Sequence, residues 1–419
     1  MKQMLMHVEG DTLQTAVLEN GQLTEFFMER SGGASLVGNI YKGRVVNVLP
    51  GMDAAFVDIG IGKNAFLYID DMLHPHADKQ PQNKPAIREL AQPGQDLIVQ
   101  VVKDPLGGKG ARVTTHFNLP GRWLVYLPFA DYVGVSKKVA SEAERERLRL
   151  AGEQLKRDEE GIIMRTAAEG EDLGSLQADV FKLRERWRSI GEKAGSAVAP
   201  AMLHCEEGLL HRVIRDTFSS DMDELWIDHS ARYGEAAELL RDISPAFDGR
   251  VKLYRGGGGR GIFQEFRVSE QIESAFSRRI PMQSGGYLIW EETEALTVID
   301  VNTGKFTGSD NLEDTVFRTN LEAAALIGRL LRVRDVGGIV IVDFIDMERD
   351  DSRSKVLARM IEEARRDGTK TSIVGWTRLG LMELTRKKAR ENASRQLAET
   401  CKSCDGKGMV RSVQKGNHP

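Results

Sequence analysis

Apolar and polar positions alternate through the first part of the chain, on both sides of an Asn20-Gly21 dipeptide. Alternation with a period of two is typical of strands and Asn-Gly favours a tight turn, so residues 1–36 are predicted to form a strand, a turn and a second strand. The alternation continues over residues 38–115. Five short strands there predict a small closed barrel, and an OB-fold, whose open face commonly binds oligonucleotides, has that strand number.

Helical spacing enters after residue 116. Residues 117–214 mix short strands with stretches such as SEAERERLRLAGEQL, where apolar residues recur every three or four positions. Residues 215–278 contain the strand candidates ELWID, VKLYR and IFQEFRV. From residue 280 onward strands and helices alternate, and the pattern closes on a basic helix around TRKKARENASR. A multidomain α/β protein with an all-β barrel follows from these patterns.

The composition matches that of a soluble globular protein, with 41% hydrophobic and 29% charged residues. Because the net charge is -4 and the pI is near 6.1, attraction to a nucleic acid would have to come from local basic patches. The first residues lack the apolar stretch of a secretory signal, and no apolar run is long enough for a membrane span. We therefore expect a cytoplasmic protein with no membrane partner.

Acidic residues mark two predicted strands of the last domain. Asp300 and Asn302 lie two positions apart, so their side chains share one face of a strand. Asp343 ends an apolar run, where a carboxylate needs a cation or water. Two carboxylates on neighbouring strand ends suit magnesium, which also takes water and phosphate oxygens. The alternative is that Asp300 is a turn or capping residue and Asp343 is a solvated residue.

Candidate RNA contacts come from aromatic and basic residues. Phe56 and Phe66 are out of phase with the apolar face of their strands, and exposed aromatics on such barrels stack on bases. Packing beneath a neighbouring subdomain is the alternative. Arg165 and Thr166 end an apolar strand and could bind a terminal phosphate through charge-assisted hydrogen bonds, or form a surface salt bridge. The segment TRKKARENASR is either a phosphate-binding patch or a solvated helix face.

The cysteines include one close pair. Cys401 and Cys404 form a Cys-x-x-Cys knuckle followed by glycines, which lets both sulfurs face one tetrahedral ion. A knuckle supplies half of a Cys₄ zinc site, and Cys205 offers no second pair, so a complete site needs another protomer. A redox-active or idle pair is the alternative.

Long blocks of the sequence resemble the catalytic half of the ribonuclease E/G family. They include NIYKGRVVNVLPGMDAAFVD, QIESAF, SGGYLI, EALTVID, IDVNTG with the VDFIDM aspartate 43 positions later, and RLGLMELTRK. The resemblance runs from about residue 36 to 408. It implies that Asp300 and Asp343 bind a catalytic magnesium and that Asn302 positions the phosphate or the attacking water.

The resemblance also implies roles for other residues. It assigns RNA contacts to Phe56, Phe66, Lys109 and Arg378 with the run 386–388, and a pocket for a 5′-monophosphate to Gly121, Val125, Arg165 and Thr166. The family's VSRR-like stretch stands here as Val135-Ser136-Lys137-Lys138, which replaces bidentate arginine contacts by point charges. Zinc bound by Cys401 and Cys404 would be shared between protomers, although Lys402 replaces the family's usual proline.

The architecture that the resemblance implies has five parts. They are a ribonuclease-H-like subdomain (1–36 and 215–278), an inserted OB-fold RNA-binding domain (37–116), a 5′-sensor domain (117–214), a DNase-I-like α/β catalytic domain (279–399), and a zinc link with tail (400–419). Since the chain stops eleven residues after Gly408, we expect neither the family's small helical domain nor a degradosome-recruiting tail. A compact ribonuclease-G-like homodimer is the expectation.

The implied function is magnesium-dependent hydrolysis of single-stranded RNA to 5′-phosphate and 3′-hydroxyl ends. Ribosomal RNA maturation and messenger decay are the expected processes, with stimulation by a 5′-monophosphate. Two alternatives stay open: a non-catalytic RNA-binding or ribosome-assembly factor on the same scaffold, and a DNA nuclease, because a DNase-I-like centre does not by itself select the sugar.

Overall fold

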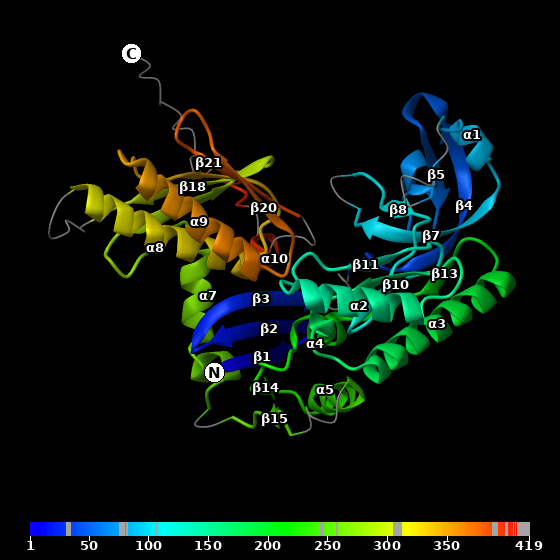
Figure 1. The fold of residues 1–419 in the computed structure, drawn as a ribbon, viewed down its shortest axis with the longest axis horizontal. Helices are drawn as coiled ribbons and strands as arrows, with labels where there is room; N and C mark the ends of the chain where they lie inside the picture. Colours follow the sequence, from blue (N-terminus) through cyan, green and yellow to red (C-terminus); the bar gives the residue numbers. More distant parts are fainter. Residues whose placement is uncertain are drawn as a thin grey trace, which may run out of the picture. The chain divides into compact units, whose positions relative to one another are not determined.

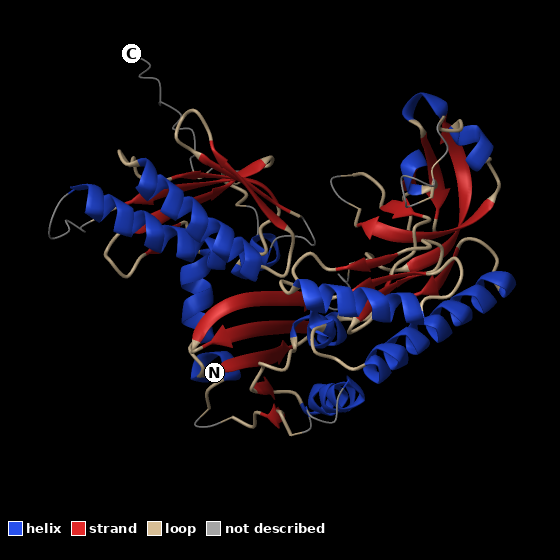
Figure 2. Cartoon of the chain, in the orientation of Figure 1, coloured by secondary structure: helices blue, strands red, loops and turns tan. Residues whose placement is uncertain are grey.

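The computed structural model describes residues 1–30, 35–74, 80, 83–105, 108–243, 247, 249–256, 259–304, 312–387, 393–398, 401–404, 406 and 408. The chain divides into two compact units. The first comprises Met1–Ser31, Asp221–Ala237 and Gly249–Pro419, and the second comprises Gly32–Ser220 and Glu238–Asp248. Each unit holds two sheets (Figures 1 and 2). No helix of the described residues is long and apolar enough to cross a membrane.

A five-stranded sheet in the order β15-β14-β1-β2-β3 opens the first unit. Its strands are β1 (Lys2–Glu9), β2 (Thr12–Glu19), β3 (Gln22–Arg30), β14 (Glu224–Ile227) and β15 (Val251–Leu253). The predicted Asn-Gly turn joins β2 to β3, and positive φ angles of 51° at Asn20 and 79° at Gly21 suit that turn. The expectation of two strands was wrong, because a second turn at Gly10, with φ 55°, splits the first strand.

Helices and a second sheet complete this unit. The six-stranded sheet has the order β16-β17-β18-β19-β21-β20. Its strands are β16 (Arg279–Pro281), β17 (Tyr287–Glu292), β18 (Leu296–Asn302), β19 (Gly338–Asp343), β20 (Thr371–Trp376) and β21 (Met382–Arg386). The helices are α6 (Ile262–Glu265), α7 (Val268–Phe276), α8 (Leu312–Val333), α9 (Asp350–Arg366) and α10 (Ala393–Leu397), while α5 (Ser230–Ile243) begins in this unit.

The core of the six-stranded sheet lies on one face only. Ile299, Val301, Val340 and Val342 are at most 4% exposed and pack with apolar residues of α8 and α9, which lie side by side (Figure 1). On the other face Val298 and Ile339 are exposed, at 36% and 49%. The alternation that predicted these strands therefore separates a helix-covered face from an open one.

Two further sequence predictions in this unit were wrong, the first of them in part. The segment TRKKARENASR, expected to be a helix, starts with the last two residues of β21, where Met382, Leu384 and Arg386 are buried with a strand's period of two. The short α10 covers the end of the segment, and residues 388–392 lie outside the described residues. The strand candidate IFQEFRV is helical instead, since Ile262, Phe263 and Val268 all pack into the core from α6 and α7.

The second unit contains a closed five-stranded barrel. The strands β4-β5-β6-β8-β7 pair in that order, β4 also pairs with β7, and β13 adds to the outer edge of β4. Their bounds are β4 (Ile40–Leu49), β5 (Ala54–Asp58), β6 (Ala65–Tyr68), β7 (Asp96–Lys103), β8 (Arg112–Thr114) and β13 (Ala201–His204), with η1 (Pro50–Met52), η2 (Ile69–Asp71) and α1 (Ile87–Leu90) between strands. The predicted closed barrel is confirmed.

A four-stranded sheet, in the order β11-β12-β10-β9, and its helices form the rest of this unit. They are β9 (Leu119–Pro120), β10 (Leu124–Leu127), β11 (Val133–Val135), β12 (Gly161–Met164), α2 (Glu142–Leu155), η4 (Thr166–Ala168), α3 (Leu173–Ser196) and α4 (Leu209–Thr217). Leu148 of α2, Leu176 and Val180 of α3 and Ile162 of β12 are fully buried in one core. The predicted helical period in α2 follows from this packing.

Candidate active site

Asp300 and Asp343 lie opposite each other on two neighbouring strands. The strands β18 and β19 are parallel, and the Cα atoms of the two aspartates are register partners. Because residues on both sides of each aspartate point into the core, both carboxylates emerge on the open face. Neighbouring strands are about 4.8 Å apart, so the two side chains can reach one ligand.

The third polar residue of the site is Asn302. Its Nδ2 donates a hydrogen bond of 2.7 Å to Oδ2 of Asp300. This bond fixes the orientation of the Asp300 carboxylate and leaves the amide oxygen of Asn302 able to accept a hydrogen bond from water or another donor. The structure thus brings together the three residues that the sequence singled out as catalytic.

The acidic pair is electrostatically unfavourable without a cation. Desolvation beside the sheet, followed by the charges of Asp300 and Asp346, raises the pKa of Asp343 above its ordinary value. Among the described residues, no group of three or more His, Cys, Asp or Glu side chains is placed to hold a metal ion. Two carboxylates nevertheless fit magnesium, which keeps several water ligands and completes its shell with phosphate oxygens.

Phe56 and Phe66 face each other outside the barrel core. They are register partners on β5 and β6, with ring centroids 5.8 Å apart at an interplanar angle of 71°. Their neighbours Ala55, Val57 and Leu67 are fully buried, whereas both phenylalanines are half-buried. The rings therefore form one edge-to-face pair on the outside of the barrel.

Lys109 is exposed in the loop that precedes β8. Two contacts hold this loop against β6: the backbone N–H of Phe66 donates to the carbonyl of Ala111 at 2.7 Å, and Gly110 lies so close to Asn64 that a Cβ would sit 1.9 Å from its carbonyl oxygen. Only glycine permits that approach. The loop contacts thus fix where the backbone presents Lys109 relative to β6.

Arg165 is held by groups of its own unit. Its Nη1 donates to the Gly121 carbonyl at 2.7 Å, and its Nη2 forms an ion pair with Asp216 Oδ1 at 2.8 Å. Thr166 follows it, and the hydroxyls of Thr166 and Ser136 are 2.9 Å apart. The structure therefore contains a salt bridge, which was the alternative to phosphate binding predicted for Arg165. It also places the arginine beside Gly121.

Gly121 has no room for a side chain, because a Cβ would lie 2.5 Å from Oδ2 of Asp179. That oxygen accepts the backbone N–H of Trp123 at 2.8 Å. Val125 lies on the adjacent β10, paired with Ile163 of β12. The four predicted pocket residues thus come from β10, the start of η4 and the turn that carries Gly121.

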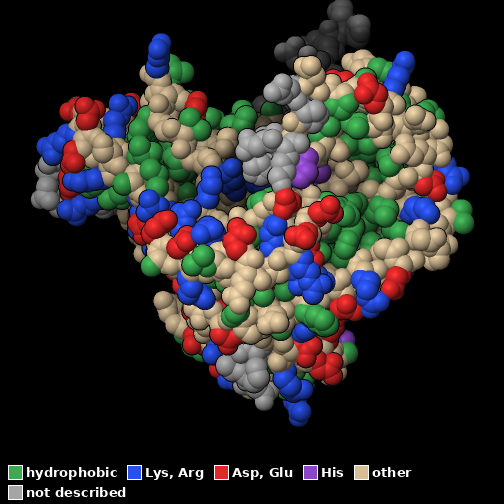
Figure 3. All heavy atoms as spheres, turned by 45° about the vertical axis from the view of Figure 1, so that its right-hand side comes forward, with side chains coloured by type: hydrophobic (Ala, Val, Ile, Leu, Met, Phe, Trp, Pro, Cys, Tyr) green, Lys and Arg blue, Asp and Glu red, His purple; other side chains and the backbone are tan. Residues whose placement is uncertain are grey.

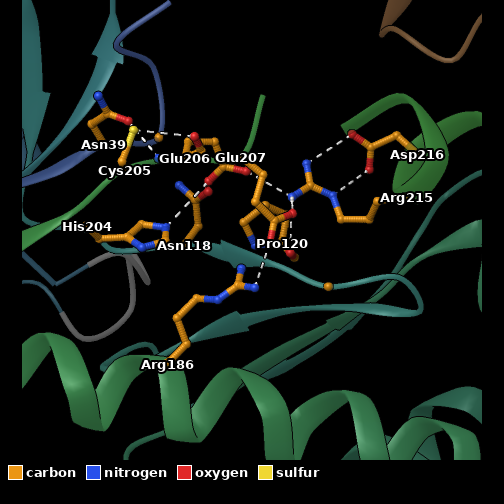
Figure 4. A network of polar contacts seen from close by, with 12 residues as sticks. Asn39, Asn118, Pro120, Arg186, His204, Cys205, Glu206, Glu207, Arg215 and Asp216 are labelled. Atoms are coloured by element: carbon orange, nitrogen blue, oxygen red, sulfur yellow. Dashed lines mark hydrogen bonds and ion pairs between the residues drawn. The ribbon is translucent and has the colours of Figure 1, made fainter. Parts of the chain in front are cut away.

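A polar network supports the carboxylate that pairs with Arg165 (Figure 4). Arg215 lies between Asp216 and Glu206, with its Nε 3.1 Å from Asp216 Oδ1 and its Nη1 2.9 Å from Glu206 Oε1. Burial alone would raise the pKa of Asp216, but the hydrogen bonds and charges of Arg215 and Arg165 lower it below its ordinary value. Asp216 is therefore an ionised anchor for Arg165.

Only some residues of the predicted basic patch are exposed at the surface. Arg378 is exposed in the turn between β20 and β21, and Lys387 is exposed at the end of β21. Arg386, by contrast, is buried and forms ion pairs of 2.7 Å with both Asp335 and Asp367. The expectation that Arg386 contacts RNA was therefore wrong, and Lys388 lies outside the described residues. On the face drawn in Figure 3, basic and acidic side chains are interspersed rather than grouped by sign.

The cysteine knuckle has features of a thiolate site. Cys401 is exposed, and hydrogen bonds from the backbone of Ser403 and Cys404 lower its pKa below the ordinary thiol value. The backbone N–H of Gly408 donates to Sγ of Cys404 at 3.3 Å. Backbone donors directed at sulfur favour the thiolate form that zinc requires. The donor set of one chain still amounts to half of a tetrahedral site.

Comparison with known proteins identifies relatives over most of the chain. A model of the Ribonuclease E/G family matches residues 118–389. Ribonuclease G of Escherichia coli is 42% identical over 418 residues, which is 98% of this chain and 85% of that protein. Ribonuclease G of Haemophilus influenzae is 41% identical over 417 residues, 98% of this chain and 84% of that protein. Ribonuclease E of Nostoc sp. is 39% identical over 395 residues, 94% of this chain and 57% of that protein.

Proposed function

The chain belongs to the ribonuclease E/G family, and on that premise we propose that it is a magnesium-dependent endoribonuclease that hydrolyses single-stranded RNA. The observation that supports this most is the register pairing of Asp300 and Asp343 on the open face of the six-stranded sheet. Asp300 and Asp343 would hold the magnesium, which supplies a Lewis acid at the scissile phosphate.

The remaining chemistry belongs to the side chains and water. The amide of Asn302 orients Asp300 and offers its oxygen to the attacking water. Water loses one proton as its oxygen adds to phosphorus, the bond from phosphorus to the 3′ oxygen breaks, and the 3′ oxygen takes up one proton. The products are a 3′-hydroxyl on one fragment and a 5′-phosphate on the other.

The barrel contributes binding of bases. We assign to it the role of an OB-fold, in which the Phe56 and Phe66 rings stack on bases of the single strand. Base stacking on aromatic rings is worth about 1–3 kcal/mol for each base, so the pair could supply much of the affinity for unpaired RNA. Lys109 and Arg378, both exposed, would contact the phosphate backbone.

The four-stranded sheet would sense the 5′ end of the RNA. A 5′-monophosphate would bind Arg165 and Thr166, with Gly121 and Val125 lining the pocket, and it would share or replace Asp216 as the partner of Arg165. Lys137 and Lys138 would add point charges without the bidentate geometry of arginine. Stimulation by a 5′-monophosphate is therefore part of the proposal.

Zinc, shared between the knuckles of two protomers, would link a homodimer through Cys401 and Cys404. Mutation of Cys401 to Ser should then release zinc and shift the protein toward monomer in sedimentation. A dimer that persists without zinc would rule out this link.

We propose ribosomal RNA maturation and messenger decay as the processes that the enzyme serves.

One cleavage assay tests the chemistry. Wild type, Asp300→Asn, Asp343→Asn and the control Asp350→Asn, which alters an exposed carboxylate on α9, are incubated with one RNA oligonucleotide and with DNA of the same sequence. With magnesium, the variants at 300 and 343 should lose about a hundredfold or more in rate, as expected when several kcal/mol of metal stabilisation is removed, and the control should not.

The remaining arms of the assay separate the alternatives. EDTA should abolish cleavage, and RNA with a 5′-monophosphate should be cut faster than RNA with a 5′-hydroxyl. Cleavage that persists in Asp343→Asn or without a divalent cation contradicts the mechanism. RNA binding without any turnover would identify a non-catalytic RNA-binding factor, and equal cutting of DNA would identify a general nuclease.

A further inference from the structure

An arginine stacked on a tyrosine lies on the same sheet as the acidic pair, two strands away from Asp300. The guanidinium carbon of Arg279, on β16, is 3.9 Å from the ring centroid of Tyr287, on β17. Arg279 is exposed and Tyr287 is half-buried. A planar guanidinium stacked on an aromatic face gains cation–π energy and loses rotational freedom, while its N–H groups stay available at the edge.

The strand register places this pair on the same face as the catalytic residues. Arg279 is paired with Ile289, Ile289 with Asp300, and Asp300 with Asp343, so one row of register partners crosses four strands. In the adjacent row Tyr287 is paired with Asn302. Leu288 and Trp290, the alternate residues of β17, are buried in the core, which confirms that this row faces outward.

The separation within the row decides what the arginine can do. Arg279 lies two strand spacings from Asp300, roughly 10 Å between Cα atoms. At that range, across Ile289 and in the presence of salt, its charge gives Asp300 little direct relief, because the Debye length is about 8–10 Å. The acidic pair is therefore not the electrostatic partner of Arg279.

Among the described residues, Arg279 stacks on Tyr287 but forms no ion pair. In the part of the chain that the structure describes, no carboxylate or carbonyl accepts a hydrogen bond from its guanidinium. The neighbouring Arg278 differs, because its Nη2 lies 2.5 Å from Oε1 of Glu291. An arginine that is fixed by stacking and still has its donors available is suited to bind a phosphate through two hydrogen bonds.

We propose that Arg279, positioned by Tyr287, binds an RNA phosphodiester next to the scissile one and so sets the register of the backbone over Asp300 and Asp343. This inference rests on the proposed function. A single strand that crosses the open face along the row brings one phosphate to the acidic pair and an adjacent phosphate to the guanidinium. The contact places the substrate and takes no part in the bond changes.

The test combines protein variants with neutralised phosphates. An RNA oligonucleotide with one cleavage site is prepared unmodified and with a single methylphosphonate directly 5′ or directly 3′ of the scissile linkage. The enzymes are wild type, Arg279→Ala, Arg279→Lys, Tyr287→Phe and the matched control Arg278→Ala. The second-order rate constant kcat/KM, and kcat and KM separately, are measured for each combination of enzyme and RNA.

At one of the two positions, the methylphosphonate should lower kcat/KM of wild type and Arg278→Ala by about tenfold, the scale of a hydrogen-bonded charge contact at an exposed site. Arg279→Ala should lose a similar factor on unmodified RNA, mainly in KM, and should be insensitive to that methylphosphonate. Arg279→Lys should recover part of the loss, and Tyr287→Phe, which keeps the stacking ring, should stay close to wild type.

If Arg279→Ala is as sensitive as wild type to both methylphosphonates, the proposal is refuted while the endoribonuclease function stands. Absence of cleavage by wild type would instead refute the function. A binding measurement then still tests the contact: in the Asp343→Asn background, Arg279→Ala should reduce the salt slope of RNA affinity by about 0.7, the value for one phosphate on a single strand. An unchanged slope would overturn the phosphate contact by itself.

Discussion

Replacement of Arg386 by alanine separates a structural arginine from an RNA-binding one. The Arg386 side chain is 3% exposed, and its Nε and Nη1 lie 2.7 Å from Asp367 and Asp335 respectively. Nη1 also donates to the Val336 carbonyl at 2.9 Å. These contacts tie the end of β21 to the turns that follow α8 and α9.

The expected loss follows from the burial of the partner carboxylate. Asp367 is 5% exposed and would lose the two hydrogen bonds that the Arg386 guanidinium donates to it. Removal of one member of a buried ion pair costs about 3–5 kcal/mol, because the remaining charge stays desolvated. That loss is large compared with the total stability of a domain, about 5–15 kcal/mol. We therefore expect a marked drop in the unfolding midpoint of the first unit.

The pKa of Asp367 determines how the stability difference between wild type and Arg386→Ala depends on pH. Burial would raise the pKa of Asp367, but the hydrogen bonds and charge of Arg386 lower it below its ordinary value of 3.8. A lowered pKa stabilises the fold above the unfolded value and loses that stabilisation as the pH falls through the folded value. The difference in unfolding free energy between wild type and Arg386→Ala should thus be largest near neutral pH and shrink as the pH falls, because the buried Asp367 of the variant takes up a proton at a higher pH than the ion-paired carboxylate of wild type.

The assay is urea denaturation followed by circular dichroism, with RNA affinity measured at low temperature where the variant is folded. Lys387→Ala is the control, since Lys387 is adjacent and exposed and its loss should change stability by about 0.5 kcal/mol or less. Wild-type stability combined with lost RNA affinity in Arg386→Ala would refute the structural role and restore the RNA-contact interpretation.

Two further predictions concern other parts of the chain. The hydrogen bond that the His7 ring donates to the Asp228 carboxylate is the largest cause that raises the pKa of His7 above 6.5, so this pair stabilises the first unit below that pH and loses the effect as the pH rises through the folded value. Denaturation at several pH values should therefore show a decline for wild type that His7→Gln lacks, and equal pH profiles would contradict the linkage. Gly121→Ala should destabilise the second unit by about 1–3 kcal/mol, because its Cβ would lie 2.5 Å from Asp179. It should also weaken stimulation by a 5′-monophosphate, and an unchanged melting temperature would show that the turn adapts.

Local periodicity was sufficient to predict the structure where each residue's environment is determined by its own strand or turn. The outward direction of Asp300 and Asn302 follows from the two-residue repeat of β18, and the hairpin between β2 and β3 follows from Asn20-Gly21. The direct pairing of Asp300 with Asp343 could not be derived in that way, because it depends on the register of two strands separated by the long helix α8.

Charged residues were less predictable, since distant partners decide their burial. TRKKARENASR has the composition of a solvated helix, yet Arg386 is buried because Asp335 and Asp367 reach it from two other turns. Arg165 likewise pairs with Asp216, 51 positions along the chain, within a network that also holds Arg215. The stacking of Arg279 on Tyr287 gave no sequence signal beyond an alternating β16.

The fold holds the acidic pair in place against its own repulsion. Two carboxylates about 4 Å apart repel each other by about 1 kcal/mol in water and about 4 kcal/mol at the effective dielectric near a protein surface. On the other face of the same strands Ile299, Val301, Val340 and Val342 are buried, and burial of an aliphatic side chain contributes about 1.5–3 kcal/mol. Four such residues outweigh the repulsion.

Asn320 of α8 fixes the chain just beyond the pair. It is fully buried, its Nδ2 donates to the Ile345 carbonyl at 2.8 Å, and its Oδ1 accepts the Ile345 N–H at 3.1 Å. Because both backbone groups of Ile345 are bonded to one buried side chain, these hydrogen bonds restrain the chain two residues beyond Asp343. The repulsion is therefore relieved when Asp343 takes up a proton or when a cation binds, and this gain in free energy supports the proposed magnesium site.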